Sequence, residues 1–220
     1  MSHIGDIEPF YHFLVEGEKN NFDPNPLFDT RWYREKYNIP TSESALKNYI
    51  YGGHLTRDPH FMFDSTYYRS IVICNDSSPL EHYLASRTGI DPCVLFDARY
   101  FAEQYNKISG AKLDAGIPLL VQYLESSMYC DIDPHPLFSK KYYSSRYGDV
   151  RSSGIDPFEH YMRFGYFEKR QTHRIFEPDH YLDLRPAARG RNPHIQTLTM
   201  CLVRMLLRAA QGPRIRRKTG

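Results

Sequence analysis

Three histidines are the residues whose type and spacing best suit acid–base chemistry, because each stands beside an aromatic residue in a recurring motif. They are His12 in PFYHF, His82 in PLEHY and His160 in PFEHY. Histidine titrates near neutral pH and can serve as a general base or a ligand. The equivalent positions elsewhere carry Asn48 and Gln122, which form hydrogen bonds but cannot act as bases at neutral pH. We therefore predict that the histidines make structural hydrogen bonds that tie a helix to a turn.

Other patterns of catalytic or metal-binding residues are weak in this sequence. Asp131-Ile132-Asp133 has the DxD spacing of a metal-binding pair, but Asp133 belongs to an Asp-Pro dipeptide that recurs along the chain. The sequence contains neither GxGxxG nor a P-loop, and its spacing supports no Ser-His-Asp or Cys-His arrangement. Four widely spaced cysteines form no CxxC pair, which argues against a zinc module or a disulfide framework: Cys74, Cys93, Cys130 and Cys201. We predict no catalytic, cofactor-binding or metal-binding residue.

Charge and hydropathy argue against two classes of function. The formal net charge is only +2, which gives no global electrostatic reason to expect nucleic acid as a partner. The basic excess is local, in RIRRKTG from Arg214 onward. No window reaches the roughly 18 apolar residues of a membrane span, and MSHIGDIEPF lacks the pattern of a secretory signal. We expect a reducing, cytoplasmic setting, with peripheral membrane contact as an alternative.

Two series of aromatic residues, called ladders here, recur with similar spacing along the chain. They indicate the helices that must position the motif histidines. The first ladder is the phenylalanine of each FD-like motif: Phe28, Phe63, Phe96, Phe138 and Phe176. The second is the aromatic residue that closes each HY-like motif: Phe13, Tyr49, Tyr83, Tyr123 and Tyr161. The step from the second ladder to the next phenylalanine is 13 to 15 residues, whereas the reverse step varies from 20 to 27. The nearly fixed step predicts units near 8–38, 44–73, 78–106, 116–148 and 156–185, in a repeat array over 1–190.

Each half of a unit carries the signals of a helix. An N-cap residue, whose side-chain oxygen accepts a backbone N–H of the first turn, follows the first-ladder phenylalanine: Asp29, Asp64, Asp97 and Ser139. Four residues after the cap, an aromatic side chain completes a hydrophobic staple: Tyr33, Tyr68, Phe101 and Tyr143. Gly17, Gly53 and Gly165 fit as helix-ending C′ glycines of the second half. Because such short helices do not persist alone in water, we predict an all-α helical-repeat solenoid of about five two-helix units.

The C-terminal part differs from the repeats, because it is aliphatic and basic. Residues 191–211 include QTLTMCLVRMLLRAAQ, in which Arg204 and Arg208 lie one helical turn apart, and residues 212–220 form a basic tail. One interpretation is a terminal helix that caps the last unit, since terminal repeats are usually atypical. The other is an interfacial or partner-binding helix whose arginines, with the tail, meet anionic lipid.

The most complete copy of the pattern runs from Pro134 to Arg170, from PHPLFSKKYYSSRYGDV to GIDPFEHYMRFGYFEKR. PFYHFLVEGEKN, from Pro9 to Asn20, matches its second half. The pattern FDxxxY, a variable stretch, PLxHY and GxxExR resembles tandem repeats found beside glycosyltransferase domains in bacterial surface-polysaccharide biosynthesis proteins. The resemblance covers roughly residues 8 to 185. Because such repeats accompany the enzymes without being their catalytic domains, it implies an associated module.

These observations lead to several hypotheses about function. Aromatic side chains off the ladders are candidates for a ligand or partner surface, because rings stack on pyranose faces: Tyr51, Tyr129 and Tyr166. We expect a non-catalytic scaffold or binding module, with a polysaccharide-assembly enzyme such as a glycosyltransferase, or a glycan, as its partner. The alternative is a partial or degenerate glycosyltransferase, the enzyme class we would expect if the chain were active. A further alternative is recruitment to a membrane surface or a protein through the basic C-terminal helix.

Overall fold

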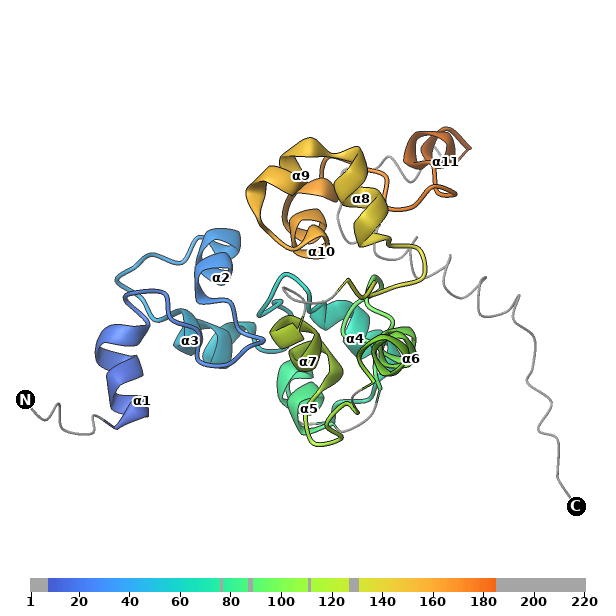
Figure 1. Cartoon of the computed structure of the whole chain (residues 1–220). Coiled ribbons are helices and arrows are strands. Elements are labelled where there is room, and N and C mark those ends of the chain that lie inside the picture. The colour runs from blue at the N-terminus through green and yellow to red at the C-terminus, as the bar shows by residue number, and fades with distance from the viewer. Residues whose placement is uncertain (1–7, 76, 87–88, 111, 127–130, 185–220) are drawn as a thin grey trace, which may run out of the picture.

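The computed structural model describes residues 8–75, 77–86, 89–110, 112–126 and 131–184. Within these ranges the regular elements are helices, and the one β-type contact is an isolated bridge between His135 and Phe138 (Figure 1). The predicted all-α class is confirmed. No described helix is long and apolar enough to cross a membrane. The predicted terminal helix, the basic tail, Tyr129, Arg204 and Arg208 lie outside the described residues.

Five helices begin directly after the FD-like motifs and are called FD helices here. They are α2 (Thr30–Tyr37), α4 (Ser65–Ile71), α6 (Ala98–Ser109), α8 (Lys140–Arg146) and α11 (Pro178–Leu184). In the first four, the N-cap side chain accepts the third backbone N–H of the helix at 2.8 to 3.3 Å: Asp29, Asp64, Asp97 and Ser139. A further short helix, α9 (Gly148–Ser153), follows α8.

A second set of helices begins at the PxxHY-like motifs and is called the HY helices. Three of them change from one α-helical to one π-helical turn: α1 (Pro9–His12) with η1 (Phe13–Gly17), α3 (Ala45–Asn48) with η2 (Tyr49–Gly53), and α10 (Pro157–His160) with η3 (Tyr161–Gly165). The other two, α5 (Pro79–Ala85) and α7 (Leu119–Ser126), are α-helical throughout. The sequence signals did not predict the π-helical turns, because cap and proline preferences describe only where a helix begins.

The glycines at the ends of the π-helical turns correct one prediction. Gly17, Gly53 and Gly165 were predicted to be C′ residues, which adopt a positive φ, but positive φ among the described glycines occurs at Gly110 and Gly154. Gly53 is needed instead for close approach, because a Cβ added there would lie 2.6 Å from a tyrosine hydroxyl of the neighbouring FD helix. Gly165 is approached even more closely by the equivalent hydroxyl.

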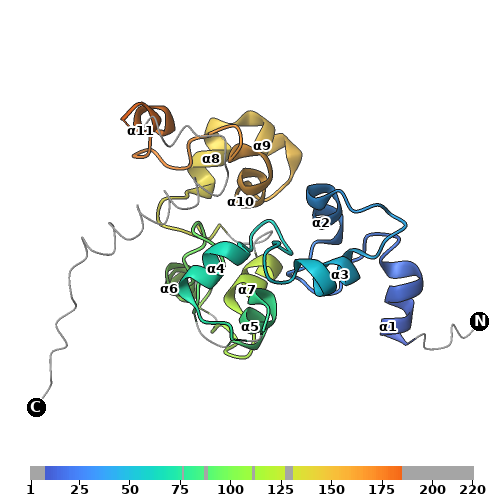
Figure 2. The same ribbon diagram turned by 180° about the vertical axis from the view of Figure 1, so that it is seen from behind.

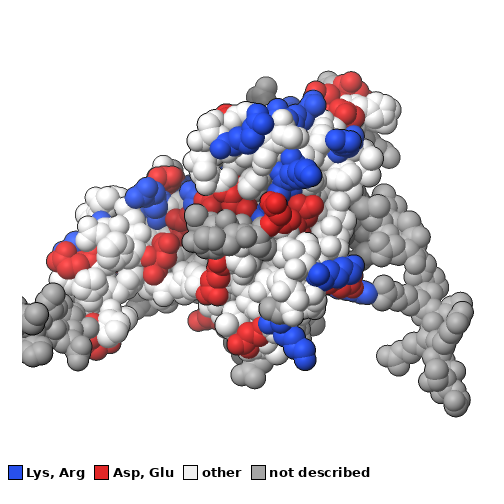
Figure 3. Space-filling view, viewed as in Figure 1, with Lys and Arg blue, Asp and Glu red and all other residues white. Residues whose placement is uncertain are grey.

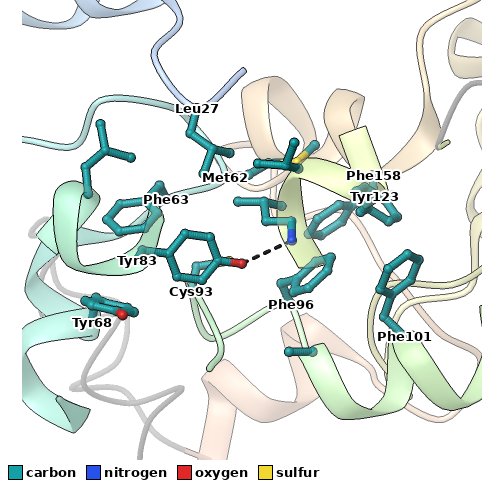
Figure 4. Close-up of a cluster of buried hydrophobic side chains, with 14 of the residues drawn as sticks. Leu27, Met62, Phe63, Tyr68, Tyr83, Cys93, Phe96, Phe101, Tyr123 and Phe158 are labelled. Atoms are coloured by element: carbon teal, nitrogen blue, oxygen red, sulfur yellow. Dashed lines mark hydrogen bonds between the residues drawn. The ribbon is translucent and has the colours of Figure 1, made fainter. Parts of the chain in front are cut away.

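The core is a row of aromatic clusters, each formed by an FD helix and the HY helix that follows it. In the first cluster the ring centroids of Phe28, Tyr33 and Tyr49 lie 5.2 to 5.9 Å apart. Three more clusters repeat this arrangement: Phe63, Tyr68 and Tyr83; Phe96, Phe101 and Tyr123; Phe138, Tyr143 and Tyr161. None of these side chains is more than 5% exposed, and part of the row is drawn in Figure 4.

We call each such pair a module: module 1 is α2 with α3 and η2, module 2 is α4 with α5, module 3 is α6 with α7, and module 4 is α8 with α10 and η3. The pairs can be followed from both sides in Figures 1 and 2. The predicted units instead grouped each FD helix with the HY helix before it. The difference arises because the nearly fixed spacing belongs to the turn between modules, whereas the packed pair encloses the segment of variable length.

Candidate functional site

Every complete module caps its FD helix twice. The aspartate of the preceding Asp-Pro or Asp-Ile-Asp-Pro stretch accepts the first backbone N–H of the helix through Oδ1 at 2.8 Å: Asp23, Asp58, Asp91 and Asp133. The N-cap residue accepts the third N–H. Two of the four donors left unpaired at a helix start are thus satisfied. The sequence signal for the second cap was the constant seven-residue distance from this aspartate to the first helical residue.

Two of the three motif histidines, His82 and His160, lie within hydrogen-bond distance of a tyrosine on the partner helix. The hydroxyl of Tyr68 lies 2.9 Å from His82 Nδ1, and that of Tyr143 lies 3.2 Å from His160 Nδ1. Module 1 has Asn48 at the histidine position, and its Oδ1 accepts a hydrogen bond from the Tyr33 hydroxyl at 3.1 Å. The bond therefore joins the FD helix to the HY helix, whereas we predicted a bond from a helix to a turn.

In module 3 the histidine position is occupied by Gln122, which makes different hydrogen bonds. Phe101 replaces the tyrosine and has no hydroxyl group, so Gln122 turns toward the connecting segment. Its side chain accepts the N–H of Asp114 at 2.8 Å and donates to the carbonyls of Asp114 and Ile117 at 2.9 and 2.8 Å. His12, by contrast, is exposed in α1. Where the FD helix lacks the tyrosine, the HY helix therefore also lacks the histidine.

His160 is buried beside several charged side chains. Burial and the positive charge of Arg170 lower the pKa of His160, and the nearby carboxylates only partly oppose this. Arg170 itself binds Asp149 at 2.7 and 3.0 Å and also contacts Glu168. Burial raises the pKa of the Tyr143 hydroxyl above its ordinary value. The tyrosine hydroxyl stays protonated, which suits a structural hydrogen bond with the histidine ring.

A further side chain with a function in the repeat lies three residues before the phenylalanine of each FD-like motif. His60 Nδ1 accepts the N–H of Met62 at 3.0 Å, and Asn25 Oδ1 accepts the N–H of Leu27 at 2.9 Å. Burial lowers the pKa of His60 to about 3. Cys93 holds the same position, and burial raises the pKa of its thiol to about 12. The sequence analysis missed these positions, whose signal was their constant distance from the phenylalanine.

Neighbouring modules are joined by two recurring contacts. In modules 1 to 4 the N-cap residue of the FD helix donates its backbone N–H to a carbonyl in the turn before the next FD helix at 3.0 to 3.1 Å, in the pairs Asp29–Pro59, Asp64–Pro92, Asp97–Pro134 and Ser139–Thr172. HY helices are linked through hydroxyl groups. Tyr83 accepts the N–H of Leu120 at 3.0 Å, and Tyr123 donates to Asp156 at 3.3 Å.

The described residues contain no group of three or more histidine, cysteine or acidic side chains arranged to hold a metal ion. Asp133, the second carboxylate of the DxD match, serves as one of the helix caps. One of the two carboxylates of the DxD match therefore has a structural role in the repeat. Elsewhere, on the face shown in Figure 3, acidic and basic side chains are interspersed.

A cavity of about 550 Å³ beside module 3 is the candidate binding site. Ala102 and Asn106 line it from α6, Lys112 and Asp114 from the connecting segment, and Leu119 from the start of α7. The connection belongs to the longest of the variable intervals. The volume of the cavity lies within the range of small-molecule sites. Polar groups beside apolar walls can orient a polar ligand there.

Comparison with module 1 shows why module 3 has room for this cavity. Arg34 holds in α2 the position that Ala102 holds in α6. The side chain of Arg34 is buried, donates to the Pro40 carbonyl at 2.7 Å and lies 3.9 Å from Glu18. Alanine leaves the corresponding space between helix and connection unfilled.

The off-ladder tyrosines lie apart from this cavity. Tyr51 is 83% exposed at the end of module 1. Tyr166 is half-buried, with its ring edge-on to Tyr161 and Phe167 at 6.3 and 5.4 Å. Tyr129 is outside the described residues, so the described tyrosines do not form one aromatic surface with the cavity.

A scan against protein-family models finds no match, and searches of curated proteins and of solved structures find no similar chain.

Proposed function

We propose that this chain is a non-catalytic scaffold or binding module of bacterial surface-polysaccharide assembly, acting in the cytoplasm and built as a helical-repeat solenoid. The observation that carries the proposal is how the repeat uses its polar side chains. Most of those at the repeat positions cap helices, join the two helices of a module, hold its connecting segment or link neighbouring modules. The resemblance to repeats beside glycosyltransferase domains supports the polysaccharide setting.

The two junction contacts support the solenoid. A backbone bond from the N-cap residue recurs in all four modules, and a hydroxyl bond between successive HY helices occurs from module 2 to module 3 and from module 3 to module 4. Contacts that depend on the nearest neighbour are typical of quasi-linear repeat proteins. In such arrays, segments of variable length carry the differences between copies, which favours the module 3 cavity as the binding site.

A filled-cavity variant tests the binding function. Ala102→Arg places in module 3 the side chain that module 1 accommodates at the same position. We expect the purified wild-type chain to bind glycans on an array, or to recover an assembly enzyme from a bacterial lysate, and Ala102→Arg to lose that binding. Thr66→Arg is the control, because it adds the same charge at an exposed position of α4.

Three results would count against the proposal. The first is recovery of neither a glycan nor an assembly enzyme by the wild-type chain. The second is unchanged binding by Ala102→Arg, which would show that the cavity is not the binding site. The third is turnover of a nucleotide sugar by the purified chain, which would favour a glycosyltransferase instead.

A further inference from the structure

The repeat leaves half a module at each end of the described chain. α1 and η1 form a HY helix without the close FD-helix partner that the other four described HY helices have. Among the described residues, which end at Leu184, α11 is an FD helix without the close HY-helix partner found in modules 1 to 4. The two half-modules lie at opposite ends of the described array (Figures 1 and 2). Within the described residues, each leaves exposed some side chains whose counterparts are buried.

Exposure at matched positions identifies the two surfaces. Phe10 in α1 is 63% exposed, whereas Phe158, at the same position in module 4, is completely buried. At the other end, Ile175 before α11 is 78% exposed, although the equivalent Leu27 is completely buried. Both pairs have the same place in the repeat, and in each pair the more exposed side chain belongs to an end where no close partner helix is described.

The α1 end closely reproduces the HY helix of module 4. PFYHFLVEG and PFEHYMRFG share Pro, Phe, His and Gly at the same places, and both change from an α-helical to a π-helical turn. Their caps also match. Glu8 accepts the N–H groups of Phe10 and Tyr11 at 3.1 and 2.7 Å, as Asp156 does for the corresponding residues of α10. The surface that α8 covers in module 4 is therefore preformed in α1 and η1.

The α11 end retains the ring arrangement of an FD helix. Phe176 and Tyr181 have centroids 6.1 Å apart, in the staple geometry of the other FD helices. The turn before the helix is also preserved, because Phe176 donates its N–H to the His173 carbonyl at 3.1 Å. Phe176 and Tyr181 are only half-buried, whereas their counterparts in modules 1 to 4 are at most 1% exposed.

We infer that α11 of one chain docks on α1 and η1 of a second copy, so that a complete module forms across two molecules. The second copy is the matching occupant, because this contact continues the interface already present in four modules. The Tyr181 hydroxyl meets His12, as the Tyr143 hydroxyl meets His160 at 3.2 Å within module 4.

The aromatic contacts of the new interface follow the same template. In module 4 the ring of Phe138 lies 5.1 Å from that of Phe158 and 5.4 Å from that of Tyr161. Phe176 occupies the place of Phe138, and Phe10 and Phe13 supply the two facing rings. Because the two surfaces differ, the contact is heterologous, and repetition gives a ring or an open filament.

Two charge substitutions block the two surfaces separately. Phe10→Glu blocks the α1 end, and Tyr181→Glu blocks the α11 end; circular dichroism verifies the fold of both. In sedimentation velocity, we expect the mass of the wild-type chain to rise with concentration and each variant alone to remain monomeric. Ile73→Glu is the control, because Ile73 is 84% exposed away from both ends, and it should self-associate like the wild type.

Mixing the two variants gives the sharpest result. The Tyr181→Glu chain retains an intact α1 end and the Phe10→Glu chain an intact α11 end, so an equimolar mixture should form a dimer and nothing larger. The inference is overturned by a wild-type chain that stays monomeric at millimolar concentration. It is also overturned if either variant alone still self-associates, or if the mixture contains only monomers. None of these outcomes depends on glycan or enzyme binding, so the test is independent of the proposed function.

Discussion

The hydroxyl group of a buried tyrosine restricts which residue can end the π-helical turn packed against it. In module 1 the Tyr33 hydroxyl lies so close to Gly53 that a Cβ there would be only 2.6 Å away. Tyr143 and Gly165 repeat this contact more tightly in module 4. The glycine and the hydroxyl are therefore one structural unit, joined to the histidine or asparagine that completes the hydrogen bond.

Gly53→Ala should destabilise the protein by about 1 to 3 kcal/mol, because the added methyl group overpacks a buried contact. Gly52→Ala is a control in the same turn, since an added Cβ there has nothing within 4 Å, and its effect should be small. Denaturant unfolding measures both. Gly53→Ala combined with Tyr33→Phe should recover part of the lost free energy of unfolding. Equal effects of the two alanines would contradict this interpretation.

His60 makes stability depend on pH. Burial lowers its pKa in the folded chain from 6.5 to about 3. Between these values the unfolded chain binds a proton that the folded chain excludes, so the free energy of unfolding falls as pH falls from 6.5 toward 3. The contribution is up to about 1.4 kcal/mol per pH unit.

His60→Asn should reduce this pH dependence, because asparagine supplies the same acceptor without titrating, as Asn25 does in the first copy. The substitution also removes the ring stacked on Phe61 at 4.1 Å, so we expect lower stability at pH 7. The useful measurement is the slope of unfolding free energy between pH 6.5 and 4. Identical slopes for the two proteins would exclude His60 as the titrating group.

At the scale of helices, the sequence predicts well where each helix begins and poorly which helix it packs against. Caps such as Asp97 and staples such as Phe96 with Phe101 depend on residues a few positions apart, and the structure has them at the predicted helix starts. The pairing of helices depends on contacts such as Tyr33 to Asn48 across a segment of variable length. Spacing alone does not reveal which of two neighbouring helices is packed more closely. The cavity escaped prediction because it depends on how the connecting segment runs past the small side chain of Ala102, which spacing does not reveal.

Asp97→Ala should lower the free energy of unfolding by about 0.5 to 2 kcal/mol, the usual cost of losing an N-cap. The Oδ1 atom of Asp97 accepts the N–H of Tyr100 at 2.9 Å, and alanine leaves that donor without its acceptor. Asp97→Ser is the matched control, because Ser139 caps α8 in the same way. Thermal and denaturant unfolding should show serine close to wild type, and equal losses would argue against capping.

At the scale of the whole molecule, the chain returns so that the end of module 4 touches the beginning of module 1. Arg163 in η3 binds Asp29, the N-cap of α2, at 2.8 Å, and its guanidinium lies 4.3 Å from the ring of Phe61. The two partners of this ion pair are 134 residues apart. Most other described side-chain bonds join the same or neighbouring modules, so this contact adds a long-range constraint to a structure held mainly by local ones.

A double-mutant cycle should assign about 1 kcal/mol of coupling energy to this partly buried pair. Arg163→Ala removes the cation, and Asp29→Ser removes the carboxylate while keeping a cap of the kind used by Ser139. The exposed pair Arg99–Glu103 serves as a comparison and should give a smaller coupling. Solution scattering should detect a larger radius of gyration for Arg163→Ala. An additive cycle together with an unchanged radius would contradict the closing role.

The backbone bond from each N-cap to the following module has a consequence for how such a chain can grow. Its donor and acceptor are main-chain atoms, so the side chains of a copy can change without breaking the link. A module duplicated in tandem would meet its neighbours with the required donor and acceptor already in place. Gene duplication followed by sequence drift is therefore a low-cost route to longer arrays, and copies as different as LFDTRWY and IFEPDHY can belong to one lineage.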